Sequence, residues 1–182
     1  PDLYYRGPVF CMTPYRPNDI LTDMKITKLG HCCLLVEIRG IRFLTDPGAY
    51  TTAQNTVHNI HYVVISHEHT DHLHIESLKT VLANNPNAKV ICNASVGAIL
   101  AKESISFIKV SDSESHECDG VNVSAHGTQH ETIYKSYEQV ENTGYMFDGK
   151  LFYPGDAFHK PNVPVDILAF PVTGPWCTIA QA

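Results

Sequence analysis

Long hydrophobic runs are missing from this sequence of 182 residues. No apolar stretch approaches the ~20 residues that a membrane-spanning helix needs. Residues 1–23 are rich in proline and aromatic residues, and they lack the apolar segment of about 7–15 residues that defines a signal peptide. We therefore expect a protein that has no place in a membrane and works in the cytoplasm.

Cysteine pairs at the usual metal or redox spacing are also missing. The six cysteines include the neighbours Cys32 and Cys33, but no C-x-x-C pair. The chain is long enough to bury a core of its own, so it does not need the disulfide framework of a small secreted domain. We interpret the cysteines as reduced thiols of a cytosolic protein, and we place Cys32 and Cys33 on one strand, facing opposite ways.

Positive charge is scarce. Lys and Arg number 13 against 19 Asp and Glu, which gives a net charge of −6 with neutral histidines. This balance argues against a large interface with nucleic acid or with an anionic membrane. Hydrophobic residues make up 43% and charged residues 18% of the chain, which excludes a disordered protein. A G-x-S-x-G motif is absent too, so nothing indicates a serine nucleophile.

Histidine, in contrast, is concentrated in one stretch. Residues 61–72 read HYVVISHEHTDH, in which the run from Tyr62 to Ile65 predicts a buried strand. Side chains two residues apart point the same way in an extended chain, so His67 and His69 can bind one ion together. A histidine-rich surface loop is the alternative. However, a buried strand leads directly into the stretch, and strand ends are where α/β folds place their sites.

Two more ligand-type side chains follow in the same stretch. If the chain turns helical at Asp71, the side chains of Asp71 and His72 face a second position beside the first. The H-x-H-x-D-H pattern therefore suits two ions a few ångströms apart, as two-metal hydrolysis requires. Imidazole and carboxylate suit Zn²⁺, and also Mn²⁺ or Fe²⁺. Water held there would have its pKa lowered from about 15.7 toward about 7, and Asp71 would hold that water and shuttle its proton.

This pattern resembles the signature of the metallo-β-lactamase superfamily. Five further stretches match the superfamily in the expected order: Leu29-Gly30-His31, Thr45-Asp46-Pro47, Gly127-Thr128-Gln129-His130, Tyr153-Pro154-Gly155-Asp156 and Gly174-Pro175-Trp176. Together they resemble the branch of small cytosolic hydrolases that includes the ascorbate-phosphate lactonase, and the match runs from about Met24 to the end. The resemblance implies an α/β fold of the four-layer αββα type, with two sheets between helices.

The ion held by His67 and His69 needs a third ligand from elsewhere in the chain. A strand predicted over 121–125 leads to His126 and His130, and both qualify chemically. The family pattern places the ligand in a Gly-x-x-His setting, which favours His130. His126 would then be a strand-end histidine that faces solvent.

Asp156 is the expected link between the two ions. It follows Tyr153-Pro154-Gly155 at the end of a predicted strand. The resemblance implies that its carboxylate bridges both ions, and a turn-forming aspartate is the alternative. Asp71 and His72 complete what the sequence offers to the second position.

Three residues outside these patterns are candidates for the pocket and its surroundings. Asp46 could orient a ligand histidine by accepting a hydrogen bond, or it could form a turn before Pro47. His31 could line the pocket or be an ordinary strand histidine, and His159 could touch the substrate. Trp176, the only tryptophan, is expected to pack in the core or an interface rather than to hold substrate.

The function expected from these residues is hydrolysis of a small molecule by a metal-bound hydroxide. The substrate would be a small ester, lactone, amide or phosphoester. A phosphodiesterase or nuclease of the same superfamily is the alternative, although the acidic charge argues against nucleic acid. Redox relatives carry a carboxylate in place of one motif histidine, and His69 argues against that class. A homo-oligomer is compatible with the sequence.

Residues 24–182 are expected to form one domain, after an extension of uncertain origin at 1–23. Hydrophobic patterning predicts strands at 24–29, 31–38, 41–45, 62–65, 88–92, 105–110, 121–125, 144–147, 151–153 and 166–170, and helices at 73–83 and 94–102. The segment 111–119 is expected to be an acidic turn region. The resemblance implies a further helix, strand and ligand histidine beyond Ala182. We therefore expect a truncated, catalytically incomplete chain with an under-liganded second position, in which 177–182 begin the next helix.

Overall fold

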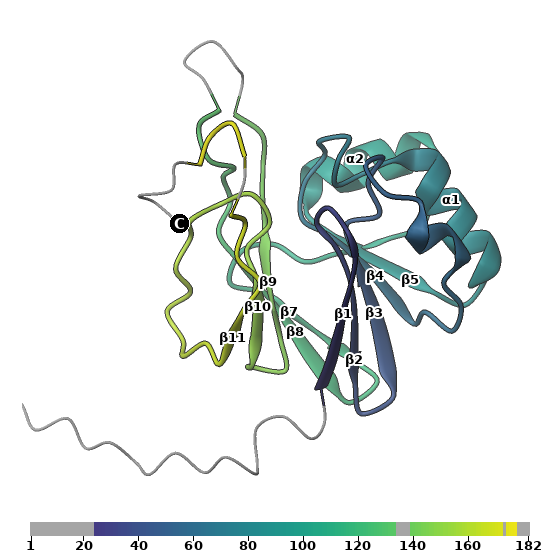
Figure 1. Cartoon of the computed structure of the whole chain (residues 1–182), viewed down its shortest axis with the longest axis horizontal. Coiled ribbons are helices and arrows are strands. Elements are labelled where there is room, and N and C mark those ends of the chain that lie inside the picture. The colour runs from purple at the N-terminus through teal and green to yellow at the C-terminus, as the bar shows by residue number, and fades with distance from the viewer. Residues whose placement is uncertain (1–23, 134–138, 173, 178–182) are drawn as a thin grey trace, which may run out of the picture.

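Two β-sheets lie face to face, with two helices on the outer side of the first sheet (Figure 1). The computed structural model describes residues 24–133, 139–172 and 174–177. The expected extension at 1–23 lies outside these residues, and so does most of the helix expected over 177–182. Neither of the two described α-helices is long and apolar enough to cross a membrane.

The first sheet has six strands in the order of the chain. They are β1 (Met24–Gly30), β2 (Cys33–Ile38), β3 (Ile41–Thr45), β4 (Tyr62–Ile65), β5 (Lys89–Cys92) and β6 (Ile108–Lys109). β1, β2 and β3 are antiparallel, and β3 to β6 are parallel. The β2–β3 hairpin turns at Arg39 and Gly40, whose φ angles of 47° and 83° suit a tight two-residue turn.

Parallel strands need crossover connections, and the two helices provide them. Helix α1 (Ile75–Asn84) connects β4 to β5, and α2 (Ala94–Lys102) connects β5 to β6. Asn93 caps α2 by accepting a hydrogen bond from the Val96 amide. The region 49–60 includes a short 3₁₀ helix, η1 (Ala53–Thr56).

The second sheet has five strands in the order β11-β10-β9-β8-β7. They are β7 (Ser115–Cys118), β8 (Val121–His126), β9 (Gly144–Phe147), β10 (Leu151–Tyr153) and β11 (Ile167–Leu168). β7 to β10 are antiparallel, and β11 pairs parallel to β10. In the described ranges no helix covers the outer face of this sheet, so three of the four layers of the expected sandwich are seen there.

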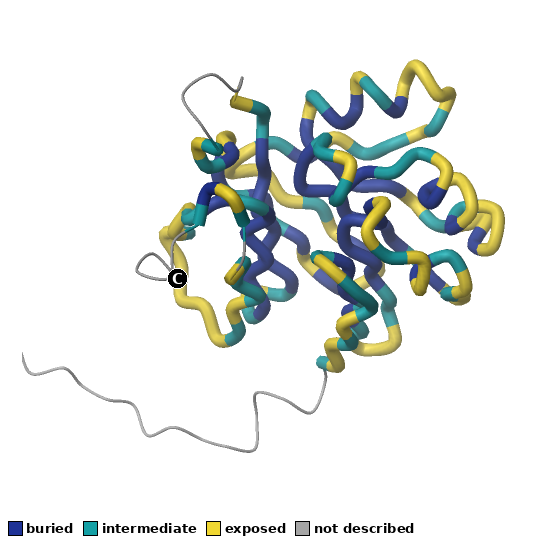
Figure 2. Tube along the Cα trace, turned by 45° about the horizontal axis from the view of Figure 1, so that its top comes forward, coloured by how far each residue is buried: buried dark blue, intermediate teal, exposed yellow. Residues whose placement is uncertain are grey.

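Strand β4 connects the two parts of the core. Tyr62 and Val64 belong to the cluster between the sheets, whereas Val63 and Ile65 belong to the cluster under the helices. All four residues are buried, which confirms the prediction of a strand covered on both faces. Figure 2 shows the buried residues concentrated along the strands, while the helices expose their outer sides. The end of β4 is therefore a rigid place from which to project a site.

Several predicted boundaries were wrong. His31 and Cys32 form a turn rather than the start of a strand, because His31 has a φ of 43°. The supposed turn region 111–119 contains strand β7, whose polar sequence SHEC hides its pairing with β8. Helix α1 begins at residue 75 instead of 73, since 69–73 form a separate hydrogen-bonded turn. The strands predicted at 105–110 and 166–170 are only two residues long.

Arg39 connects the two sheets at their turns. Its guanidinium donates to both carboxylate oxygens of Asp148, at 2.7 and 2.8 Å, and to the Gly120 carbonyl oxygen at 2.5 Å. Asp148 lies in the β9–β10 turn and Gly120 in the β7–β8 turn. Bidentate contacts of this kind are the stronger form of an arginine–carboxylate pair. Hydrogen bonding to Arg39 lowers the pKa of Asp148 below its usual value.

We expect Arg39→Ala to lower the free energy of unfolding by about 1 kcal/mol at pH 7, because the side chain is partly exposed and such pairs contribute little more. Because the pKa of Asp148 is lowered on folding, the contribution is fully present above the unfolded value of about 3.9 and is lost as the pH falls through the folded value. Urea unfolding across this range should show the two proteins converging in acid.

Asp148→Asn is the matched control for this pair. Asparagine tolerates the φ of 53° at this position, so the turn is kept while the charge is removed. A double-mutant cycle between the two substitutions should give a coupling of about the same size as either single loss. A destabilisation by Arg39→Ala that stays constant down to acid pH would show that the pairing with Asp148 adds nothing measurable to stability.

Candidate metal centre

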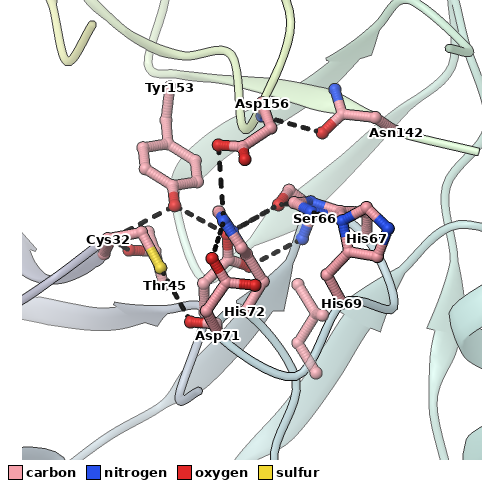
Figure 3. Close-up of polar contacts among 12 residues, drawn as sticks. Cys32, Thr45, Ser66, His67, His69, Asp71, His72, Asn142, Tyr153 and Asp156 are labelled. Carbon is pink, nitrogen blue, oxygen red and sulfur yellow. Dashed lines mark hydrogen bonds and ion pairs between the residues drawn. The ribbon is translucent and has the colours of Figure 1, made fainter. Parts of the chain in front are cut away.

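Loops from both sheets meet just beyond the end of β4 and form a cluster of histidines and aspartates (Figure 3). The segment 66–72 follows β4 directly, while His130 and Asp156 come from loops after β8 and β10 of the second sheet. The peptide at Ser66 anchors this crossing. Its carbonyl oxygen accepts from the Thr143 amide at 3.0 Å and from the Asn93 side chain at 3.0 Å.

His67, His69 and His130 form the first group. One ring nitrogen of each lies within 4.8 Å of the others, and the ring centroids are 4.7 to 4.8 Å apart. His130 Nδ1 donates to the Glu131 carbonyl oxygen at 2.6 Å, which leaves Nε2 with its lone pair facing the group. The structure thus brings together the three histidines that the sequence proposed as ligands of the first ion.

Asp71, His72 and Asp156 form the second group, again with ligand atoms within 4.8 Å of one another. His72 Nδ1 hydrogen-bonds to Asp46 Oδ2 at 2.7 Å. Its Nε2 therefore points the other way, 3.6 Å from Asp71 Oδ2 and 3.3 Å from Asp156 Oδ1. These are the residues that the sequence proposed for the second ion.

Asp156 lies between the two groups. Its Oδ1 faces His72 Nε2 at 3.3 Å, and its Oδ2 faces His130 Nε2 at 3.5 Å. The Trp176 indole donates to Oδ2 at 3.2 Å, and the Asp156 amide donates to Asn142 Oδ1 at 3.0 Å. One carboxylate oxygen is thus presented to each group, which is the geometry of a bridging ligand.

The donor atoms fit divalent cations. His72 Nε2 and His130 Nε2 are buried and have no hydrogen-bond partner among the described residues. Such atoms are costly unless something pairs with them, and a cation between imidazole nitrogens and carboxylate oxygens would do so. Two imidazole-rich groups with carboxylates suit Zn²⁺, Mn²⁺ and Fe²⁺ alike.

The electrostatics of the cluster favour positive charge between its carboxylates. Burial alone would raise the pKa of Asp156, but the facing rings of His130 and His72 lower it well below its usual range. Burial alone would lower the pKa of His72, but the charge of Asp46 and the facing Asp156 raise it well above its usual value. Burial and the neighbouring His72 lower the pKa of His67, so that ring is neutral and ready to bind an ion.

Asp46 supports the cluster from behind. It is fully buried, and its carboxylate accepts hydrogen bonds from four donors. Oδ1 accepts from the Ser66 amide at 2.7 Å, and Oδ2 accepts from the Ser66 hydroxyl, the Tyr153 hydroxyl and His72 Nδ1 at 2.6 to 2.7 Å. Its own carbonyl also closes a turn to Gly48. The hydrogen bond to a candidate ligand histidine and the turn before Pro47 are therefore both present, and the contact with His72 fixes the orientation of that ring.

Two glycines allow the loops to approach this closely. A Cβ at Gly155, where φ is 64°, would lie 2.3 Å from Asn142 Oδ1 and 2.8 Å from Ser66 Cβ. A Cβ at Gly48 would lie 1.8 Å from the Asp71 carbonyl oxygen. Any larger residue would push apart the loops that carry Asp156 and Asp71.

The remaining candidates take different places. His31 lies at the edge of the cluster, where its Nε2 is 3.0 Å from Asp71 Oδ2, and it lines the cavity. His126 hydrogen-bonds to Ser124 and stays outside the cluster. His159 is exposed, packs over Gly127 and does not line the cavity.

Sequence reasoning missed the supporting role of Ser66, Tyr153, Asn142 and Trp176. The Ser66 hydroxyl lies 2.9 Å from His67 Nδ1 as well as touching Asp46. Trp176 packs as expected, against Phe158 and His130, but it also binds Asp156 and lines the cavity. Tyr153 and Trp176 belong to the family-like stretches, which was the available signal. Nothing in the sequence distinguishes Asn142.

Two facing sheets with such a cluster beyond the end of β4 define a class of protein, the metal-dependent enzymes of the metallo-β-lactamase fold. The chain belongs to the β-lactamase superfamily. The family model described as the β-lactamase superfamily domain matches residues 25–182.

Protein Rv0786c of Mycobacterium tuberculosis is 32% identical to this chain over 164 residues, which cover 87% of this chain and 76% of that protein. CmlA, a diiron β-hydroxylase from Streptomyces venezuelae, is similar in structure with a TM-score of 0.59 and 22% identity, over 72% of this chain and 29% of that one. Igni18, a metallo hydrolase from Ignicoccus hospitalis, gives a TM-score of 0.55 and 22% identity, over 74% and 61% of the two chains.

This chain spans less than two thirds of the length of either solved chain. At these identities the structural likeness shows the fold alone. A hydroxylase and a hydrolase share that fold, so the reaction of this chain has to be argued from its own site.

Proposed function

We propose that this chain hydrolyses a small ester, lactone, amide or phosphoester at a two-metal centre. His67, His69 and His130 would hold one ion, Asp71 and His72 the other, and Asp156 both. The observation that carries the proposal is the placement of Asp156, which presents one oxygen to each group. Bound divalent ions of this kind lower the pKa of water toward about 7 and polarise a carbonyl or phosphoryl oxygen.

The residues around the cluster have definite tasks in such a reaction. Asp71 is the proposed proton acceptor for the attacking water. Its Oδ2 lies 3.0 Å from Nε2 of His31, whose side chain is 38% exposed, so a proton taken up by Asp71 has a short route to solvent. Trp176 and Asn142 hold Asp156 in position through hydrogen bonds at its carboxylate and its amide.

The cavity beside the cluster supports a small substrate. Its wall combines the polar cluster with the apolar side chains of Leu34, Ile133, Phe170, Val172 and Trp176. Among the described residues that line it, Lys28 is the only lysine or arginine, against the carboxylates of Glu68, Asp71 and Asp156. A nucleic-acid backbone needs a basic groove, so a nuclease is the weaker candidate.

Cytoplasmic location is part of the same proposal. Its support is that Cys32, Cys33, Cys92 and Cys118 form no disulfide in the described part of the chain. Reduced thiols are typical of cytosolic proteins, in which disulfides are rare.

Turnover of a substrate panel tests the proposal. The protein would be stripped with a chelator, reloaded with Zn²⁺, Mn²⁺ or Fe²⁺, and offered lactones, esters, amides, phosphodiesters and DNA. We expect hydrolysis of at least one small-molecule class, loss of that activity on chelation and its return with metal. His126→Ala, outside the cluster, should behave as wild type. Turnover that survives chelation, or a preference for DNA, would contradict the proposal.

A further inference from the structure

A cysteine lies beside the second group of the metal centre, and the proposed function gives it no role. Cys32 belongs to the β1–β2 turn, is partly buried and lines the cavity. The ligand atoms of His31, Cys32 and His72 lie within 4.8 Å of one another. The thiol donates to the Asp71 carbonyl oxygen at 3.0 Å, and Figure 3 shows the sulfur next to Asp71.

The position of this thiol is fixed by the fold. The Cys32 carbonyl oxygen accepts hydrogen bonds from the Tyr153 hydroxyl at 3.1 Å and from Thr45 Oγ1 at 3.3 Å. Tyr153 comes from the second sheet and Thr45 from β3, so the turn is held from two directions. The next residue, Cys33, is fully buried in the core under the helices and cannot reach the cavity.

His72 belongs both to this group and to the second metal group, and it carries an unpaired atom. His72 is 1% exposed, and its Nε2 has no hydrogen-bond partner in the described part of the chain. His31 Nε2 is already engaged with Asp71 Oδ2 at 3.0 Å, and its side chain is 38% exposed. Of the two possible donors in the β1–β2 turn, His31 and Cys32, the Cys32 sulfur is therefore the more buried one.

We propose that Cys32 Sγ is a ligand of the second metal ion, together with Asp71, His72 and Asp156. This inference rests on the proposed two-metal centre and adds a donor to it. On binding, the thiol proton leaves to solvent, the hydrogen bond to the Asp71 carbonyl is released, and a sulfur–metal bond forms. The thiolate and the two carboxylates then offset three of the four positive charges of two divalent ions.

A thiolate changes which metals the second position selects. Sulfur is a soft ligand that favours Zn²⁺, whereas carboxylate and water suit Mn²⁺ and Mg²⁺. Cys32 should therefore make the second position prefer Zn²⁺ over Mn²⁺. The first position, which has three histidines and no sulfur, should not share this preference. Cys32→Ser keeps the size and the hydrogen bond to Asp71 while it removes the soft donor.

Cobalt substitution tests the assignment without any substrate. Stripped protein would be titrated with Co²⁺, and the ultraviolet spectrum read for sulfur-to-cobalt charge transfer. The band should be absent with the first equivalent, which goes to the three histidines, and should appear with the second. Cys32→Ser should lack the band and bind the second Zn²⁺ at least about tenfold more weakly, while Cys33→Ala should keep both properties.

Alkylation of the thiol gives an independent readout that peptide mass spectrometry can assign to Cys32. Bound Zn²⁺ should protect Cys32 from iodoacetamide, and chelation should restore its labelling. Two bound equivalents of Co²⁺ without a sulfur band would overturn the role of Cys32 and leave the two-metal proposal intact. Failure to bind Co²⁺ at all would overturn both.

Discussion

Replacing both His67 and His69 by alanine should remove the first metal ion and reduce turnover more than about a hundredfold. Loss of a residue that only supports a metal ligand costs about 10–100-fold, and loss of the ligands themselves should cost more. The two rings supply two of the three nitrogen donors of the first group, and His130 with one Asp156 oxygen offers too few donors for tight binding. Elemental analysis after gel filtration should show one metal fewer per chain than in the wild type.

His126→Ala is the matched control for this double variant. His126 is the other histidine that the sequence offered as a third ligand, and its ring bonds to Ser124 instead of facing the cluster. It should keep full metal content and turnover. If the double variant retains its metal content while it stays folded by circular dichroism, the first group is not a metal site.

Asp46→Asn should be the most damaging single change for the folded state, with a loss of about 3–5 kcal/mol. The carboxylate is fully buried and accepts four hydrogen bonds, and an asparagine would turn an amide donor toward some of those same donors. Urea unfolding in the presence of a chelator measures this loss apart from any effect of metal. Asparagine tolerates the φ of 39° at this position, so backbone strain does not contribute.

The same change should also weaken the second metal ion about 10–100-fold, because His72 loses the partner that orients its ring. Tyr153→Phe is the graded control. It removes one of the four donors and leaves the Asp46–His72 contact, so it should cost only about 1 kcal/mol and weaken the second metal ion less than Asp46→Asn does, through the loosened Cys32 turn alone. Equal effects of the two substitutions would show that Asp46 does not act through His72.

Strand β4 shows how far local pattern can carry an inference. The run YVVI predicts a strand buried on both faces, and the structure places alternate residues in the two core clusters. Residues that follow such a strand must emerge at the edge of the sheet, so the location of the motif could be foreseen. The tight turns at 39–40 and 148–149 are also local features, because each has a glycine, Gly40 or Gly149, that adopts positive φ without strain.

Strand β7 and the β1–β2 turn show where local pattern fails. The sequence SHEC has no alternation, and it is a strand only because β8 offers it a partner. Cys32 looks like a strand residue from its neighbours, but Gly30 and His31 both have positive φ and turn the chain so that its thiol reaches Asp71. Hydrogen bonds from Tyr153 and Thr45 hold that turn, and neither residue is near it in sequence.

The sequence by itself determined the strand and the spacing of His67, His69, Asp71 and His72, because these depend on neighbours along the chain. The fold was expected from the family resemblance of the motif and the five further stretches. Only the tertiary structure decided that His130 joins the motif residues and His159 does not, and that Asp156 faces both groups. Those outcomes depend on how two sheets pack, which sets distances between residues some 60 to 90 positions apart. Local spacing carries no information about such distances.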